Sequence, residues 1–155
     1  MDALFKFTEF FTSRWKMHKW MQANSLSSKD KLHEAIDAYL SLDLRDGLKQ
    51  IALAQTANVY SRLDQKREAK EFYQKAIASE QKWGMRSKPA NSLYIIEYCN
   101  YFLAMLEIDT FDTETEDWAN EKLLTLNNIP ASRDYKVYYL PLPTSKFNSK
   151  QYAFH

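Results

Sequence analysis

The chain has 155 residues, of which 45% are hydrophobic and 26% are charged, and its formal net charge is +1. This composition predicts one globular domain, excludes a disordered chain, and argues against a nucleic-acid-binding protein. With two glycines and four prolines, the chain is poor in tight turns, which disfavours many-stranded folds and excludes a glycine-rich phosphate loop.

The first predicted helix spans residues 3–24. Leu4, Phe7, Phe11 and Trp15 recur at a spacing of three or four residues, and a second aromatic stripe runs beside them. We expect this helix to cap the domain and to bury its aromatic rings. Binding to a membrane surface through these rings and the basic residues between them is the alternative. Residues 27–30 are expected to cap the next helix.

Five further helices are predicted from hydrophobic periodicity and from start and stop signals. Gly47 and Gly84 are expected stops, Pro89 a start, and Thr113–Glu116 a capping box. The most apolar segment is hydrophobic on nearly all sides, which predicts a buried helix. The expected helices cover residues 29–44, 48–63, 67–83, 90–108 and 115–127.

Residues 131–155 differ from the rest because Tyr135–Pro143 combines β-branched, aromatic and proline residues. Such a segment favours extended or polyproline-like conformations over a helix. We therefore expect one α-helical domain over residues 1–130 and an extended tail over residues 131–155 that lies across the helices.

Two segments of the chain match each other. Glu34-Ala35-Ile36-Asp37-Ala38-Tyr39 aligns with Glu68-Ala69-Lys70-Glu71-Phe72-Tyr73. Each pairs an alanine with a tyrosine one helical turn later, which places both on one face of a helix. The offset between the two segments equals the period of about 34 residues that is typical of one class of helix–turn–helix repeat arrays.

Residues 50–83 resemble one tetratricopeptide repeat, in which small and aromatic residues alternate in a fixed frame. The positions that carry the resemblance are Leu53, Ala57, Tyr60, Ala69, Tyr73 and Ala76. The unit before it is degenerate, with a first helix that ends near Asn24 and fits poorly, and the unit after it is stretched. The resemblance implies an all-α fold, a short TPR-like array of about six antiparallel helices. An unrelated helical bundle is the alternative.

The resemblance also implies a concave groove that binds a peptide. Asn58 and Asn100 occupy equivalent positions, where the family often uses asparagine to bind a peptide backbone. Ala54 and Ile96 stand where binding of a free C-terminal carboxylate requires lysine, so we do not expect that specificity. The expected groove residues are Ala54, Asn58, Ser61, Arg62, Ile96, Asn100 and Leu103.

We expect no enzymatic activity, no metal and no cofactor. His18, His33 and His155 lack the spacing of a metal site, and residues 109–117 lack the pattern of a calcium loop. Cys99 is the only cysteine and lies in the most apolar segment, where a thiol is usually a packing group. An active site that the sequence does not reveal is the competing class.

The expected function is protein–protein interaction in the cytoplasm, with a partner protein or peptide bound in the groove or on a face. A dedicated inhibitor, such as an immunity protein, and a secretion chaperone are two versions of this function. A homodimer formed through the aromatic N-terminal helix is a further alternative. Neither nucleic acid nor a membrane is an expected partner, because the charge is near neutral and no apolar stretch is long enough to span a bilayer.

Overall fold

A computed structural model of the chain describes residues 18–42, 48–83 and 89–131. These residues form helices and turns and contain no strand, which confirms the predicted all-α class. The helices are residues 18–28, α2 (Leu32–Leu40), α3 (Leu48–Arg62), α4 (Lys66–Trp83), α5 (Pro89–Leu106) and α6 (Thr113–Asn128). The expected breaks at Gly47 and Gly84, and the tail from residue 132, lie outside the described residues.

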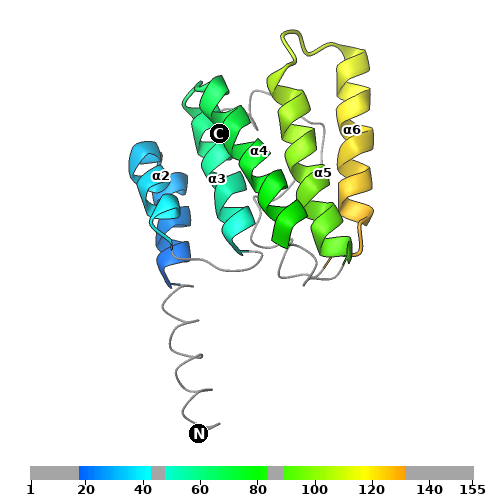
Figure 1. Cartoon of the computed structure of the whole chain (residues 1–155). Coiled ribbons are helices and arrows are strands. Elements are labelled where there is room, and N and C mark those ends of the chain that lie inside the picture. Colours follow the sequence, from blue (N-terminus) through cyan, green and yellow to red (C-terminus); the bar gives the residue numbers. More distant parts are fainter. Residues whose placement is uncertain (1–17, 43–47, 84–88, 132–155) are drawn as a thin grey trace, which may run out of the picture.

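The six helices form three hairpins that stand in a row (Figure 1). The helix at residues 18–28 pairs with α2, α3 pairs with α4, and α5 pairs with α6. Helix α3 packs against α2, α4 and α5, and α4 packs against α5 as well. Helix α3 is therefore central, and most of its side chains are buried, including polar ones.

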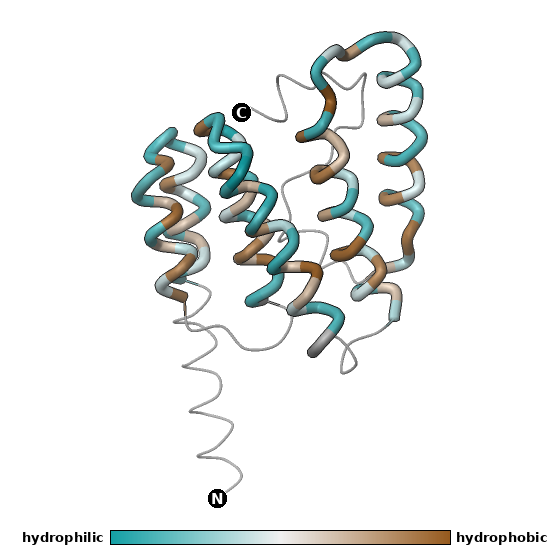
Figure 2. Tube along the Cα trace, turned by 45° about the horizontal axis from the view of Figure 1, so that its top comes forward, coloured by the Kyte–Doolittle hydropathy of each residue, from teal (hydrophilic) through white to brown (hydrophobic). Residues whose placement is uncertain are grey.

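Small residues on the helices bring α3 and α4 together, and aromatic rings fill the space beside them. Ala57 and Ala69 are fully buried. Tyr73 on α4 stacks on Phe102 of α5 with ring centroids 5.9 Å apart, and Tyr98 lies 4.8 Å from the same ring. Hydrophobic residues recur along all three hairpins in Figure 2, and on α4 they form the single buried stripe that an amphipathic helix needs.

The first helix ends later than its sequence predicted, at residue 28 instead of residue 24. Residues 27–30 are its C-terminal turn and not the cap of the next helix, so that prediction was wrong. The Lys31 amide donates to the Leu26 carbonyl at 3.0 Å, and Asp30 adopts a positive φ of 59°. This left-handed residue closes the helix in the way that glycine or asparagine often does.

Helix α6 begins at Thr113, and its N-cap is Asp112. The Asp112 carboxylate accepts a hydrogen bond from the Thr115 amide at 2.8 Å. This bond lowers the pKa of the Asp112 carboxyl, because it stabilises the ionised form. The predicted capping box at Thr113 was therefore one residue too late, whereas the predicted start of α5 at Pro89 is confirmed.

The first two hairpins repeat the same contacts, one repeat length apart. The Tyr39 hydroxyl donates to the Asn24 side-chain oxygen, and the Tyr73 hydroxyl donates to that of Asn58. The turns match too, since Asp64 has a φ of 58° close to that of Asp30. The identical pairs are Ala23 and Ala57, Asn24 and Asn58, Ser27 and Ser61, Asp30 and Asp64, Glu34 and Glu68, Ala35 and Ala69, and Tyr39 and Tyr73. The first hairpin is thus a close copy of the second.

Candidate functional site

The predicted groove residues of α3 lie mostly inside the protein. Ala54 is fully buried, and Asn58 and Ser61 are only 6% and 8% exposed. Helix α3 has neighbours on several sides, so the face that the repeat pattern assigns to a groove is covered. A partner that docks on the described surface would not reach these three side chains.

Asn58 is the centre of a buried hydrogen-bond network. Its side-chain nitrogen donates to the Tyr98 hydroxyl at 3.1 Å and to the Gln55 side-chain oxygen at 3.3 Å, and its oxygen accepts the hydroxyl of Tyr73. Burial raises the pKa of Tyr73 and of Tyr98 well above the usual 10.0. The amide therefore joins α3 to α4 and α5 and is already occupied.

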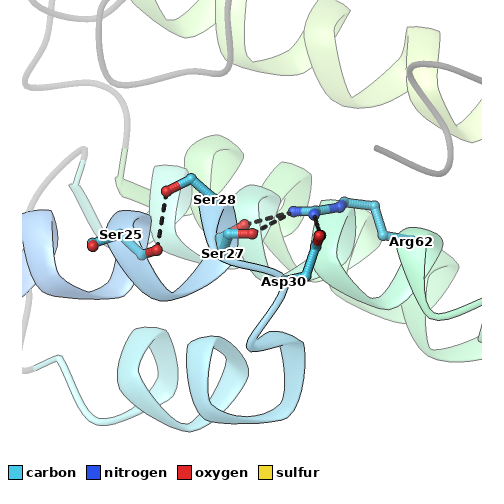
Figure 3. Close-up of polar contacts among 5 residues, drawn as sticks. All are labelled: Ser25, Ser27, Ser28, Asp30 and Arg62. Carbon is cyan, nitrogen blue, oxygen red and sulfur yellow. Dashed lines mark hydrogen bonds and ion pairs between the residues drawn. The ribbon is translucent and has the colours of Figure 1, made fainter.

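Arg62 joins the first hairpin to the second (Figure 3). One terminal nitrogen of its guanidinium donates to the carbonyl and the hydroxyl of Ser27 at 3.0 and 2.9 Å. The other nitrogen pairs with Asp30 at 2.6 Å. The Arg62 side chain is only 8% exposed, so it acts here as a link between two turns and offers little surface to a partner.

The predicted groove residues of α5 are accessible, in contrast to those of α3. Asn100 is exposed, and Ile96 and Leu103 are half-buried. Leu93, which is not one of the predicted groove residues, is 48% exposed and lies one turn before Ile96. Leu93, Ile96, Asn100 and Leu103 share one side of the helix by their spacing, and we call them the α5 face.

A hollow of about 190 Å³ lies between α5 and α6 beside the α5 face. Trp118 of α6 is half-buried and stacks on Tyr101 of α5, with ring centroids 5.9 Å apart and the planes 10° from parallel. Asn100 belongs both to the α5 face and to the lining of the hollow. The lining residues are Glu97, Asn100, Tyr101, Trp118, Lys122, Thr125 and Leu126.

Metal binding and thiol chemistry depend on clustered or ionised side chains among the described residues. No group of three or more His, Cys, Asp or Glu side chains among them could hold a metal ion. Burial, aided by the negative charge of Glu80, raises the pKa of the Cys99 thiol far above its usual value, so the thiol stays protonated at neutral pH. None of the described helices is both long and apolar enough to cross a membrane.

Comparisons of the chain with protein-family models, with curated proteins and with solved structures found no match. The aromatic residues before residue 18, which the dimer alternative requires, lie outside the described residues.

Proposed function

We propose that the protein is a non-enzymatic, TPR-like array of three helical hairpins that binds a partner protein or peptide through its third hairpin. The observation that supports this most is the repetition of one tyrosine–asparagine hydrogen bond in the first two hairpins, in the same frame of the repeat. Arrays built from such repeats use their surfaces for binding. The single buried cysteine suits a reducing compartment such as the cytoplasm.

The α5 face is the best candidate for the binding surface. Three of its four residues are large aliphatic residues, and the fourth, Asn100, has an exposed amide that can pair with a peptide backbone. Apolar side chains grouped on one accessible side of a helix commonly mark an interaction site, and here the amide of Asn100 lies between the side chains of Ile96 and Leu103. In α3 the equivalent residue, Asn58, is buried and hydrogen-bonded within the protein. In this proposal α3 therefore stabilises the fold and α5 binds the partner.

A dedicated inhibitor of a basic partner is the version of this function that the charge distribution favours. Asp109, Asp112, Glu114 and Asp117 are exposed along the turn of the third hairpin and the first turns of α6, and Glu116 is half-buried beside them. A row of carboxylates speeds association with a positively charged protein and disfavours an acidic one. A secretion chaperone would bind an extended segment of its cargo along the α5 face instead.

Affinity capture from an extract of the source organism, read by quantitative mass spectrometry, tests the proposal. The variant Leu93→Asp places a charge on the α5 face, and Leu40→Asp is its matched control, because both leucines are 48% exposed. We expect the wild type and Leu40→Asp to retain the same stoichiometric partner and Leu93→Asp to lose it. Equal retention by both variants, or no specific partner, would contradict the proposal. Far-ultraviolet circular dichroism confirms that both variants are folded.

A further inference from the structure

We infer that the hollow between α5 and α6 receives one apolar side chain from a positively charged segment of the partner. This inference rests on the proposed binding function and names the chemistry of the partner. It is carried by three observations: the size and walls of the hollow, nearby carboxylates that form no ion pair with other described residues, and the continuity of the hollow with the α5 face.

The size and the walls suit a single side chain. At about 190 Å³ the hollow is smaller than the roughly 300–1,000 Å³ of typical small-molecule sites. Tyr101, Trp118 and Leu126 supply apolar and aromatic surface, and the stacked rings of Tyr101 and Trp118 form part of the wall. Aromatic pockets of this kind are where interfaces place their anchor residues.

Glu97 and Lys122 line the hollow with one charge of each sign, and two more acidic residues flank Trp118 on α6. These two, Glu114 and Glu121, lie one turn before and one turn after Trp118. None of these three carboxylates has an ion-pair partner within the part of the chain that the structure describes. Lys122 is the one cation in the lining, so a segment that carries lysine or arginine beside its anchor gains attraction here.

A second hollow, at the start of α4, does not show the same features. It is lined by Lys66, Arg67 and Lys70 together with Glu107, and its lysines already lie 3.8 and 3.6 Å from that carboxylate. Its charges are therefore partly compensated within the protein, and its lining includes no aromatic ring. Of these two hollows, the one between α5 and α6 combines aromatic walls with carboxylates that have no ion-pair partner in the described ranges.

Because the hollow adjoins the α5 face, the bound segment of the partner should run from the hollow along that face. Asn100 lines the hollow and also lies in the row formed by Leu93, Ile96 and Leu103. A segment whose anchor enters the hollow therefore passes the exposed amide of Asn100, which can donate to and accept from a peptide backbone. The remaining apolar residues of the segment then meet the aliphatic side chains of α5.

Selection from a phage-displayed library of random linear peptides on the immobilised full chain tests the inference. We expect enriched peptides to carry one large apolar residue flanked by lysine or arginine, and to bind more weakly as salt rises. Thr125 is exposed and lines the hollow, so the longer side chain in the variant Thr125→Arg should fill the hollow. This variant should bind the selected peptides at least tenfold more weakly. The double variant Glu114→Lys with Glu121→Lys, which reverses two charges beside the hollow, should also weaken binding of these peptides at least tenfold.

The matched control is Glu34→Lys with Asp37→Lys, which changes the net charge equally on α2, at the other end of the row of hairpins (Figure 1). Binding of the selected peptides should stay within about twofold for this variant. Two results would overturn the inference and leave the proposed function standing. One is the enrichment of acidic peptides. The other is peptide binding that Thr125→Arg does not affect but Leu93→Asp abolishes. Failure to enrich any peptide would also overturn it, and the capture experiment with Leu93→Asp then decides the proposed function separately.

Discussion

At the scale of single residues, Asn58 connects three helices through one amide. Its nitrogen and oxygen contact Tyr98, Gln55 and Tyr73, all of which are buried. A satisfied polar group in a core adds modest stability, but removal of one partner takes a hydrogen bond away from each of the others. The position should therefore tolerate little substitution.

Replacement of Asn58 by alanine should lower the free energy of unfolding by at least about 2 kcal/mol. The buried Tyr73 hydroxyl loses its partner at about 1–3 kcal/mol, and Tyr98 and Gln55 each lose one hydrogen bond at about 0.5–1.5 kcal/mol. Asn24→Ala, in the half-buried copy of the bond to Tyr39, should cost about 1–2 kcal/mol. Asn100→Ala, at an exposed position, should stay within about 0.5 kcal/mol. Urea unfolding measures all three, and equal costs for Asn58→Ala and Asn100→Ala would refute this role of Asn58.

The buried tyrosines predict a loss of stability in alkaline solution. Burial raises the pKa of Tyr94 to about 12 and that of Tyr73 and Tyr98 well above 10.0. Since the unfolded chain ionises these phenols near pH 10, their contribution is complete below that pH and is lost as the pH rises towards 12. Phenolate absorbance and circular dichroism should therefore show these tyrosines ionising together with unfolding. Ionisation of all ten tyrosines near pH 10 without loss of helix would contradict the prediction.

At the scale of elements, the turns between paired helices carry the link between successive hairpins. Arg62, at the end of α3, reaches back to the turn that closes the first hairpin. Two kinds of contact are present there, buried hydrogen bonds to Ser27 and an ion pair to Asp30, whose side chain is 84% exposed. Exposed ion pairs contribute under about 1 kcal/mol, so the bonds to Ser27 should dominate.

Arg62→Ala should therefore destabilise the protein by about 2–4 kcal/mol, since it removes two largely buried hydrogen bonds and the packing of the side chain. Asp30→Asn should cost under about 1 kcal/mol, because asparagine also tolerates the left-handed backbone of that turn. Thermal unfolding of both variants gives the comparison. If Asp30→Asn proves as costly as Arg62→Ala, the exposed ion pair and not the link to Ser27 holds the hairpins together.

Helix positions could be predicted from the sequence because hydrophobic periodicity and caps are local signals. Five predicted helices overlap α2 to α6, the described part of the first predicted helix is helical from residue 18, and Pro89 begins α5 as expected. The turn at residues 27–30 was misread because serine and aspartate are common at both the start of a helix and its left-handed end. A comparison of Ala23-Asn24 with Ala57-Asn58 would have shown the repeat, since the second pair occupies the same frame one repeat later.

The burial of the predicted groove residues was predicted less well than the positions of the helices. Periodicity shows which side of a helix is apolar, but it does not show how many neighbours a helix has. Helix α3 contacts three other helices, so Asn58 and Ser61 are buried despite being polar. Helix α5 looked buried on all sides, yet Leu93 and Asn100 are exposed. The difference arises from the tertiary arrangement, which no local signal contains.

At the scale of the whole molecule, three hairpins are the usual minimum for a stable repeat array. The first two are near copies, and Arg62 and the buried asparagine bonds join them to their neighbours. The third hairpin differs in sequence, carries the accessible α5 face, and borders the hollow, whose nearby carboxylates form no ion pair within the described residues. The row thus has a repeated internal geometry in its first two hairpins and a distinct surface on its third.

The contrast between Asn58 and Asn100 tests this division most directly, because the repeat pattern places the two residues at equivalent positions. Hydrogen exchange of their side-chain amides, followed by NMR on the free protein, distinguishes a buried, hydrogen-bonded amide from an exposed one. We expect the Asn58 amide to exchange at least about 100-fold more slowly than that of Asn100, since opening α3 requires partial unfolding. Exchange of both amides at the same rate would show that α3 is accessible in the free protein and would contradict the assignment of binding to the third hairpin alone.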